Sequence, residues 1–346
     1  MEKTSNQHKL TLSFFHYFHF FIPSLFNPLN PVEEYRSWCK EKEGSLPLFL
    51  RPWYLDAVCL PEQWNICLAK NKDYKITGAM PYYRFKKKNI DVIGMPFLTP
   101  YMGIQFQYPG KQKLNSSYDF EKDVIDQITA QLPQVTYLQQ KFYPTFTYGL
   151  PFYWKNYRLD WRYTYHLSLL QDESSIWELM EGSARTQLQK TLKLVSVEKS
   201  EDTKTMYDLV TLTFSKQNKR MPYSLEQFQR LYKAVKAHNA GDIYLAKTNS
   251  DQSAVAGMFM VKDRHAVYNL VLGRDHTKDP GGSIHGILWT CIQDHIGKHD
   301  IFDFEGSMLE GPERMFRSFG STRVPVLQIT KYRNRVWKAM LAIVGY

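Results

Sequence analysis

Two acidic residues, Asp303 and Glu305, close a short segment of alternating polarity, Ile301–Glu305. In a β-strand this alternation sends Phe302 and Phe304 to one face and both carboxylates to the other. Ligands of mixed α/β sheets gather at such strand ends. A carboxylate whose pKa is raised by burial and a neighbouring like charge can take the proton that an amine loses on attacking a thioester or ester. The segment therefore predicts an acid–base site, with Glu305 as the favoured base. The alternative is that Asp303 binds backbone and Glu305 pairs with a cation.

A second pattern, Gly281-Gly282-Ser283, lies between a predicted strand and the start of a predicted helix. The first backbone N–H groups of a helix have no partner within it, and the helix dipole adds positive potential there, so such a turn can hold a phosphate. Arg274 and Lys278 add positive charge nearby. The alternative is a tight turn with Ser283 as an ordinary N-cap. We interpret Arg274, Gly281, Gly282 and Ser283 as a candidate site for an anionic cofactor.

Several other catalytic patterns do not occur in the sequence. Gly282–Gly286 places its serine one position too early for the G-x-S-x-G turn of hydrolases. His295 and His299 stand four residues apart on a predicted helix, but they have no glutamate between them and no third ligand, so they do not predict a metal site. There is neither a G-x-G-x-x-G segment nor a Walker loop. These observations argue against a serine hydrolase, a metalloenzyme, a dinucleotide enzyme and a kinase.

The composition is that of a globular protein, with 346 residues of which 43% are hydrophobic and 23% charged. It excludes disordered and collagen-like chains, and the length suits two domains better than one. Lys and Arg number 44 against 34 Asp and Glu, and the excess is spread along the chain rather than gathered in a tail. The charge favours an anionic partner such as a nucleotide cofactor, tRNA, a phospho-sugar or a membrane surface, without choosing among them. A basic surface with no such partner is the alternative.

The N-terminal segment and the cysteines indicate where in the cell the protein is expected. The uncharged run Thr11–Phe26 holds six Phe, but its sixteen residues fall short of the roughly 20 that span a bilayer. Its histidines and the lack of a small-residue cleavage site after it disfavour a signal peptide. The four cysteines form no C-x-x-C pair and no disulfide framework, which favours a reducing cytoplasm. We expect a cytoplasmic protein in which residues 1–30 are an apolar leader outside the fold or an anchor that makes it membrane-peripheral.

A repeat organises the chain. Ile66-Cys67-Leu68-Ala69-Lys70 recurs as Ile243-Tyr244-Leu245-Ala246-Lys247. After a polar turn, each copy continues with Gly78-Ala79-Met80 or Ala256-Gly257-Met258, and then with a charged turn and a third apolar run. Each copy predicts a three-stranded antiparallel meander, so we expect two related domains in tandem.

The second copy predicts the order of elements most clearly, because its apolar residues change between periods of two and of about 3.6. The order is β-α-α-β-β-β-α-β-α-β, and the first copy repeats it in outline. The predicted elements are a strand at 163–169, helices at 176–192, around 206–210 and after the capping-box residues Ser224 and Gln227, the meander, a helix at 284–296, a strand at 301–305, a helix after Pro312 and a strand at 324–329.

This order, present twice, resembles the GNAT acyltransferase fold, and the tandem pair resembles the Fem family of aminoacyl-tRNA-dependent peptidyltransferases and its bacterial GNAT-type relatives. The stretches MPFLTPYMGI (95–104), FDFEGS (302–307) and ERMFRSFG (313–320) carry the resemblance, which covers about residues 32 to 332. It implies an α/β fold with mixed sheets in two tandem GNAT-like domains, at residues 31–160 and 161–346.

The resemblance implies an acyltransferase that moves an acyl or aminoacyl group from an activated donor to an amine of a cell-wall peptide or an amino sugar. Phe316-Arg317 stands where Fem enzymes have a Phe-Lys pair, which assigns Arg317 to charge stabilisation, although arginine cannot act as a base. The alternative is that Phe316 lies in the core and Arg317 on the surface. Glu305, on the same cleft wall as Arg317, would accept the proton that the amine loses. Backbone N–H groups near Tyr268–Leu272 would polarise the carbonyl group of the donor. The substrate contacts are assigned to Tyr101, Arg185, Tyr268, Ser307 and Phe316.

Two departures from the family pattern bear on the donor. Fem enzymes that use charged tRNA commonly carry a long helical hairpin, and no charged heptad run of that length lies between Tyr163 and Asp242. The GNAT pyrophosphate loop would fall at Arg274–Ser283, where the glycines have another spacing. We expect acyl-CoA, keep aminoacyl-tRNA as the alternative donor, and expect no metal and no DNA. The rival hypothesis is a non-catalytic GNAT-like protein that binds a phospho-sugar or a partner protein.

Overall fold

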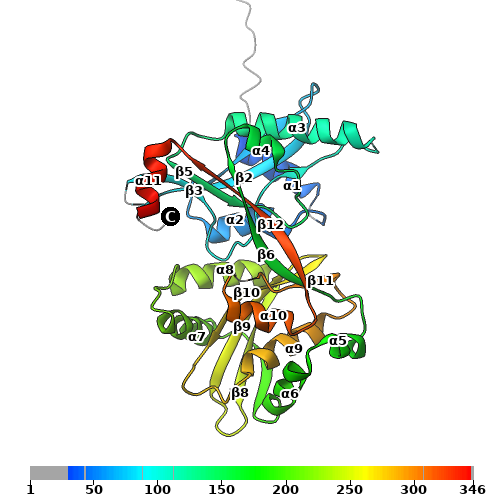
Figure 1. The fold of residues 1–346 in the computed structure, drawn as a ribbon, viewed down its shortest axis with the longest axis vertical. Helices are drawn as coiled ribbons and strands as arrows, with labels where there is room; N and C mark the ends of the chain where they lie inside the picture. Colours follow the sequence, from blue (N-terminus) through cyan, green and yellow to red (C-terminus); the bar gives the residue numbers. More distant parts are fainter. Residues whose placement is uncertain (1–29, 43, 88, 112, 307, 344–346) are drawn as a thin grey trace, which may run out of the picture. The chain divides into compact units, whose positions relative to one another are not determined.

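Twelve strands form one mixed sheet in the part of the chain that the structure describes (Figure 1). The structure is a computed structural model and describes residues 30–343 apart from 43, 88, 112 and 307. The strand order is β1-β2-β3-β5-β12-β6-β11-β10-β9-β8-β7, with β4 paired to β2. The α/β class with a mixed sheet is confirmed. The expected leader, residues 1–30, lies outside the described residues except for Asn30.

The two repeats form matching meanders. The first consists of β1 (Trp64–Lys70), β2 (Ile76–Lys87) and β3 (Ile90–Gly94), and the second of β8 (Gly241–Thr248), β9 (Ala254–Lys262) and β10 (Ala266–Arg274). The equivalence extends to the register, because Ala69 pairs with Gly78 and Ala246 with Ala256. Both ladders then shift register at the following lysine. The prediction that the copies begin equivalent strands is confirmed.

A helical crossover follows each meander and leads to a parallel strand. In the N-terminal half, α3 (Leu114–Gln131) connects β3 to β5 (Tyr137–Lys141), which lies parallel to β3. In the C-terminal half, α9 (Ser283–His295) connects β10 to β11 (Ile301–Asp303), which lies parallel to β10. Parallel neighbours require such a crossover, and the carboxyl ends of the two strands then lie at one edge.

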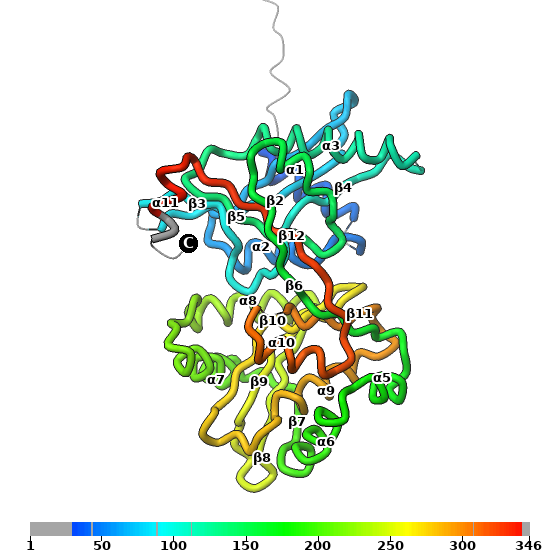
Figure 2. Tube along the Cα trace, viewed as in Figure 1, coloured from blue at the N-terminus to red at the C-terminus, as the bar shows by residue number. Residues whose placement is uncertain are grey.

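The last strand of each half joins the sheet of the other half. β6 (Arg158–Ser168) follows the N-terminal half and pairs with β11, whereas β12 (Thr322–Tyr332) follows the C-terminal half and pairs with β5. β6 and β12 also pair with each other at nine positions, side by side in Figures 1 and 2. The expected domain boundary at residue 160 therefore falls within an exchanged strand.

The remaining elements cover the sheet or extend its edges, and local capping explains several of their starts. The Ser224 hydroxyl accepts the Gln227 N–H while the Gln227 side chain accepts the Ser224 N–H, so the predicted capping box starts a helix. These elements are α1 (Pro31–Lys40), the 3₁₀ helix η1 (Leu48–Leu50), α2 (Pro52–Val58), β4 (Gln105–Phe106), α4 (Leu150–Trp154), α5 (Glu173–Leu179), α6 (Gly182–Thr191), β7 (Val195–Ser200), α7 (Thr203–Lys216), α8 (Leu225–Ala237), α10 (Glu310–Arg317) and α11 (Arg335–Ile343).

Two predictions about the C-terminal half were wrong. The single helix expected at 176–192 is two helices, because the backbone of Met180 and Glu181 is extended and the Glu181 N–H donates to the Ser318 carbonyl. The edge strand β7 was not expected, because its charged residues hide the alternation of Val195 and Val197. Charged edge strands are common, since they discourage pairing with other chains.

The hydrophobic core is continuous between the halves. Phe49 of η1 lies with its ring 5.2 Å from that of Tyr54 and 4.8 Å from that of Tyr268 on β10. Tyr54 and Phe49 are fully buried. This packing and the exchanged strands fix the N-terminal half against β10. Among the described residues there is no helix of the length and apolarity that crossing a membrane requires.

We expect Gly273→Ala to destabilise the fold, because a Cβ at this position of β10 would lie 2.4 Å from the Val210 nitrogen and 2.6 Å from the Leu209 carbonyl carbon of α7. Overpacking against backbone should lower the free energy of unfolding by about 1–3 kcal/mol. Gly286→Ala in α9 is the control, since its nearest contact would be 3.7 Å and alanine should add about 0.5–1 kcal/mol. Urea unfolding followed by circular dichroism measures both, and equal stability of Gly273→Ala and its parent would contradict the packing.

Candidate functional site

The candidate site lies where β10 and β11 separate. The two strands pair only as far as Tyr268 and Asp303. Beyond that point β10 has an irregular register at Leu270 and continues to Arg274, whereas β11 ends. A cavity of about 850 Å³ fills the gap. Its walls are the second half of β10, the turn after β11, the first turn of α9, one face of α10 and the C-terminal end of α7.

This cavity brings together several residues that the sequence singled out from distant segments. Glu305 and Phe316 lie on one side, and Arg274, Gly281 and Gly282 lie on the others. The predicted acid–base site and the predicted anion site therefore face the same space.

Glu305 combines an uncommon backbone conformation with an unpartnered side-chain oxygen. Its φ is +57°, a left-handed conformation that is uncommon for residues other than glycine and often occurs at functional sites. Its Oε1 atom is buried and has no hydrogen-bond partner among the described residues. Burial raises the pKa of Glu305 well above its usual range, the negative charge of Asp303 adds to the rise, and Lys141 opposes it. A carboxyl group whose pKa is raised holds a proton more strongly than an exposed glutamate does, which suits it to proton transfer.

Asp303 has a different environment. Its side chain is 1% exposed and accepts hydrogen bonds from the Tyr101 hydroxyl at 2.9 Å, the Thr164 hydroxyl and the Glu305 backbone N–H at 2.7 Å. His166 Nε2 lies 3.2 Å from its Oδ2 atom. Asp303 borders a separate cavity of about 230 Å³ with Tyr268, rather than the larger one.

The expectation that Asp303 and Glu305 share one strand face is therefore not met. β11 ends at Asp303, and the left-handed turn at Glu305 and Gly306 replaces the alternation that the expectation assumed. A Cβ at position 306 would lie 2.0 Å from the Tyr163 carbonyl oxygen, so only glycine fits the turn. Through the Glu305 N–H, Asp303 holds the backbone from which the Glu305 carboxyl projects.

Lys141 is the N-terminal counterpart of Glu305, and sequence reasoning missed it. It stands four residues after Tyr137, the first residue of β5 paired with β3, just as Glu305 stands four residues after Ile301, the first residue of β11 paired with β10. Burial lowers the pKa of Lys141, Glu305 opposes this change, and the charge of Arg162 adds to it. Aligning the repeats through their final strands would have revealed this pair of opposite charges.

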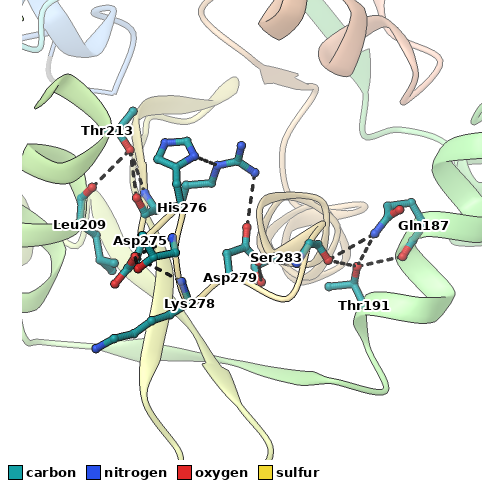
Figure 3. A network of polar contacts seen from close by, with 12 residues as sticks. Gln187, Thr191, Leu209, Thr213, Asp275, His276, Lys278, Asp279 and Ser283 are labelled. Atoms are coloured by element: carbon teal, nitrogen blue, oxygen red, sulfur yellow. Dashed lines mark hydrogen bonds and ion pairs between the residues drawn. The ribbon is translucent and has the colours of Figure 1, made fainter. Parts of the chain in front are cut away.

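The loop before α9 is held by a network of polar contacts (Figure 3). Asp279 accepts hydrogen bonds from the Gly281 N–H at 3.0 Å and the Ser283 hydroxyl at 2.6 Å, and it pairs with Arg274 at 3.4 Å. The Gly281 carbonyl accepts the Thr191 hydroxyl at 3.0 Å. The Ser283 side chain is thus engaged within the loop and does not border the cavity.

The start of α9 keeps donor groups for an anion. The backbone N–H groups of Gly282, Ser283 and Ile284 have no hydrogen-bond partner in the described part of the chain. Gly282 has φ +82°, and a Cβ there would lie 2.2 Å from the Thr191 hydroxyl oxygen, so the turn requires glycine. The carboxylate of Asp279 stabilises the loop, and Arg274 neutralises it. Free backbone N–H groups at the start of a helix can donate to an anionic group.

A small basic cluster lies at the rim beside this loop. His276 Nδ1 accepts the Arg274 Nε–H at 2.9 Å and lies 3.1 Å from Lys216 Nζ. Burial lowers the pKa of His276, and the charges of Arg274 and Lys216 lower it further. Both effects favour the neutral imidazole, and Arg274 and Lys216 place positive charge beside the loop.

Other predicted residues lie elsewhere. Arg317 is exposed, pairs with Glu313 at 3.6 Å and does not border the cavity, because successive residues of α10 point about 100° apart and Phe316 faces inward. The expectation that Arg317 shares a wall with Glu305 is therefore not met.

Arg185 donates to the Trp177 carbonyl at 3.4 Å outside the cavity. Tyr101 is buried on Asp303 and Tyr268 borders the smaller cavity. Ser307 lies outside the described residues.

One further residue of the cavity was missed. Asn269, the first residue of β10 beyond the paired region, is 4% exposed, and its Oδ1 atom has no partner within the described chain. Asn269 is the one amide side chain within the largely apolar run of β10, and that position is the sequence signal that could have singled it out. In the described ranges no group of three or more His, Cys, Asp or Glu side chains could hold a metal ion.

Comparison with known proteins identifies the fold. No protein-family model and no curated protein matches the sequence. The crystal structure of FemX matches 86% of this chain and 95% of that chain, with a TM-score of 0.58 and 14% identity. The C-terminal domain of a putative lysylphosphatidylglycerol synthetase from Agrobacterium fabrum matches 90% of this chain and 96% of that chain, with a TM-score of 0.54 and 9% identity.

A tandem GNAT protein from the clavulanic acid biosynthesis pathway has a TM-score of 0.51 and 6% identity, over 88% of this chain and 95% of that chain. The chain therefore has the tandem GNAT fold of the Fem and GNAT structures. This confirms the expected tandem GNAT fold.

We expect Glu305→Gln to change how stability depends on pH. Because the folded pKa is raised above the unfolded value of about 4.3, the contribution of Glu305 to stability is full below that value and is lost as pH rises through the folded pKa. Each unit of elevation is worth about 1.4 kcal/mol. The variant should gain stability over its parent between pH 5 and 8, as measured by urea unfolding. Glu310→Gln, at an exposed glutamate, should show the same pH dependence of the unfolding free energy as the parent. If Glu305→Gln also showed the parent's pH dependence, the raised pKa of Glu305 would be contradicted.

Proposed function

We propose that this protein is an acyltransferase that moves an acyl or aminoacyl group from an activated donor to an amine. The observation that carries the proposal is Glu305, a half-buried residue whose Oε1 atom is buried and unpartnered, at the point where β10 and β11 separate beside a large cavity. FemX and a putative lysylphosphatidylglycerol synthetase share the fold, which agrees with aminoacyl transfer but does not identify a substrate.

The chain's own groups can perform the proton transfer and stabilise charge. The amine nitrogen attacks the carbonyl carbon of the donor, and the Glu305 carboxylate takes a proton from that nitrogen. The C–N bond forms as the bond to the leaving thiolate or alkoxide breaks, and Glu305 returns the proton to the leaving group. Beyond Tyr268, the edge of β10 toward the cavity has no strand partner in the described chain, so its backbone N–H groups can stabilise the oxyanion.

We favour acyl-CoA as the donor and retain aminoacyl-tRNA as the alternative. A coenzyme A thioester would supply the activated carbonyl. The unpartnered N–H groups at the start of α9, with Arg274 and Lys216 at the rim, would hold its diphosphate. The acceptors that we propose are cell-wall peptides and amino sugars. In this proposal, catalysis depends on aligning the amine with the donor carbonyl and on stabilising the charge that develops.

We expect Glu305→Gln to lower turnover by about 10²–10⁴-fold with donor affinity unchanged, because the variant cannot take the proton. Thiol release from acetyl-CoA, and amide formation from an aminoacyl-tRNA pool, should be followed with glucosamine and a lysine-containing peptide as acceptors. Parent turnover should rise with pH as Glu305 ionises, above the usual range of a glutamate. Glu310→Gln is the matched control. If the turnover of Glu305→Gln were within threefold of the parent's turnover, Glu305 would not be the general base.

Donor binding should depend on the turn at Gly282. Isothermal titration with acetyl-CoA should show binding to the parent and at least about tenfold weaker binding to Gly282→Ala, because the added Cβ displaces the turn from Thr191. Gly297→Ala is the control, since φ is +69° there but no atom lies within 4 Å of the added Cβ. If the parent binds neither acetyl-CoA nor the tRNA pool, the protein is a non-catalytic binding protein.

A further inference from the structure

The small cavity, of about 230 Å³, lies between the two halves and takes no part in the proposed reaction. Loops of the N-terminal half, at 44–47 and 143–145, border it on one side, and the turn between β9 and β10 borders it on another. Paired residues of three strands, which are His166 of β6, Asp303 and Ile301 of β11, and Ala266 and Tyr268 of β10, complete its border. The large cavity shares none of these residues, so the two are separate sites.

His166 has one ring nitrogen that is not engaged by the protein. Its Nε2 atom lies 3.2 Å from Asp303 Oδ2. An ionised carboxylate can only accept hydrogen bonds, so Nε2 carries the hydrogen and donates it. Nδ1 then has no partner among the described residues. The His166 side chain is 19% exposed, whereas that of Asp303 is 1% exposed. Because His166 borders the small cavity, this nitrogen is available to a ligand there.

The cationic groups at the border have donor hydrogens to spare. Arg51 donates from Nε and Nη2 to the Leu46 carbonyl at 3.0 and 2.9 Å, and its other N–H groups have no acceptor in the described chain. The Arg264 side chain is exposed and makes no hydrogen bond or ion pair with a described residue. Asp263, at the same turn, already accepts three backbone N–H groups and one hydroxyl. The border therefore favours a ligand that accepts hydrogen bonds.

These features together select a chemical class of ligand. Two guanidinium groups favour an anion, and guanidinium forms its strongest hydrogen bonds with carboxylate and phosphate. Much of the remaining border is apolar, and an inorganic anion would leave that surface without contact. A carboxylate with an apolar body satisfies both requirements. The apolar residues are Leu46, Pro47, Pro144, Ala266 and Ile301.

We propose that the small cavity is a regulatory site that binds a small organic carboxylate, with Arg51, Arg264 and His166 as its polar partners. A carboxylate beside Nδ1 stabilises the doubly protonated, cationic form of His166. Asp303 connects this change to the large cavity, because its carboxylate accepts both the His166 Nε2–H and the Glu305 backbone N–H. His166 is thus a positioning residue that acts on Glu305 through Asp303.

The expected effect on Glu305 has a definite sign. The negative charge of Asp303 contributes to the raised pKa of Glu305. A cation at His166 offsets that charge, so the pKa of Glu305 should fall and its ionised form should be present at lower pH. The other charged or titratable groups are Arg51, Tyr143, Asp263, Arg264, His265 and Tyr268 around the small cavity, and Tyr54, Tyr101 and Lys141 around Glu305.

The consequence for turnover is the one part of this inference that rests on the proposed function. If Glu305 is the general base, a bound carboxylate should make turnover rise at lower pH than it does without the ligand. The binding of the ligand and the titration of Glu305 can both be measured without any turnover.

Isothermal titration with benzoate and butyrate tests the binding site. Both should bind the parent, and benzamide, which keeps the ring of benzoate without the charge, should bind at least about tenfold more weakly. Inorganic phosphate, which has no apolar body, should also bind more weakly. Arg264→Gln should weaken benzoate binding at least about tenfold. Arg335→Gln, at an exposed arginine of α11 outside the cavity, is the matched control and should bind benzoate as the parent does.

Nuclear magnetic resonance of protein labelled with carbon-13 at glutamate Cδ tests the coupling. The signal lost in Glu305→Gln identifies Glu305, and its titration midpoint should fall by at least about 0.5 pH unit with saturating benzoate. In His166→Gln, which keeps an N–H donor but cannot become a cation, saturating benzoate should leave that midpoint unchanged. His265→Gln is the control, since His265 borders the same cavity but pairs with Asp300 at 2.7 Å, and it should show the parent's shift.

The outcomes separate this inference from the proposed function. Absence of benzoate and butyrate binding to the parent, or equal binding of benzamide, would overturn the carboxylate site. Binding that leaves the Glu305 titration unchanged, or an equal shift in His166→Gln, would overturn the coupling. The proposed acyl transfer would stand in each of these cases. Absence of thiol release with every amine would instead contradict the proposed function, while binding and titration would still decide the carboxylate site.

Discussion

The pairing of β6 with β12 is the constraint on which the site depends. Each strand completes the sheet of the other half, so neither half can form its final sheet alone. β6 also supplies Thr164 and His166 to Asp303, and the N-terminal half supplies Tyr101. Asp303 then holds the Glu305 N–H. The position of the Glu305 carboxyl is thus set by groups from both halves, and separating the halves would remove these partners from Asp303.

The two neighbouring carboxyl groups differ in their hydrogen bonds. Asp303 has several donors, whereas one oxygen of Glu305 has none. Asp303 is fully hydrogen-bonded although it is buried, so its charge is tolerated. Glu305 beside it has no donor for Oε1, and the charge of Asp303 further disfavours its ionised form. A fixed negative charge and a buried, strained neighbour together produce a group that binds a proton readily, which is the property that a general base requires.

The sequence predicted the parts of the structure that depend on local patterns. The repeat predicted the two meanders, and the capping box predicted the start of α8. It could not predict the exchange of β6 and β12, because pairing between distant strands leaves no local pattern. It placed Arg317 in the cleft by likeness to a family pair, but the helix phase of α10 turns that side chain outward. Asn269 and Lys141 gained their significance only from burial and from the strand register.

The two halves treat the equivalent gap differently, and this difference accounts for the segment 95–104. In the N-terminal half, β3 ends at Gly94, and Met102 then pairs in parallel with Phe142, directly after β5. The Met102 N–H donates to the Lys141 carbonyl at 2.8 Å. This segment therefore occupies the place beside β5 that corresponds to the cavity beside β11. The same segment carries Tyr101 to Asp303. The chain that fills one gap thus supports the carboxylate that orients Glu305 at the other, which explains why one half can be structural while the other keeps an open site.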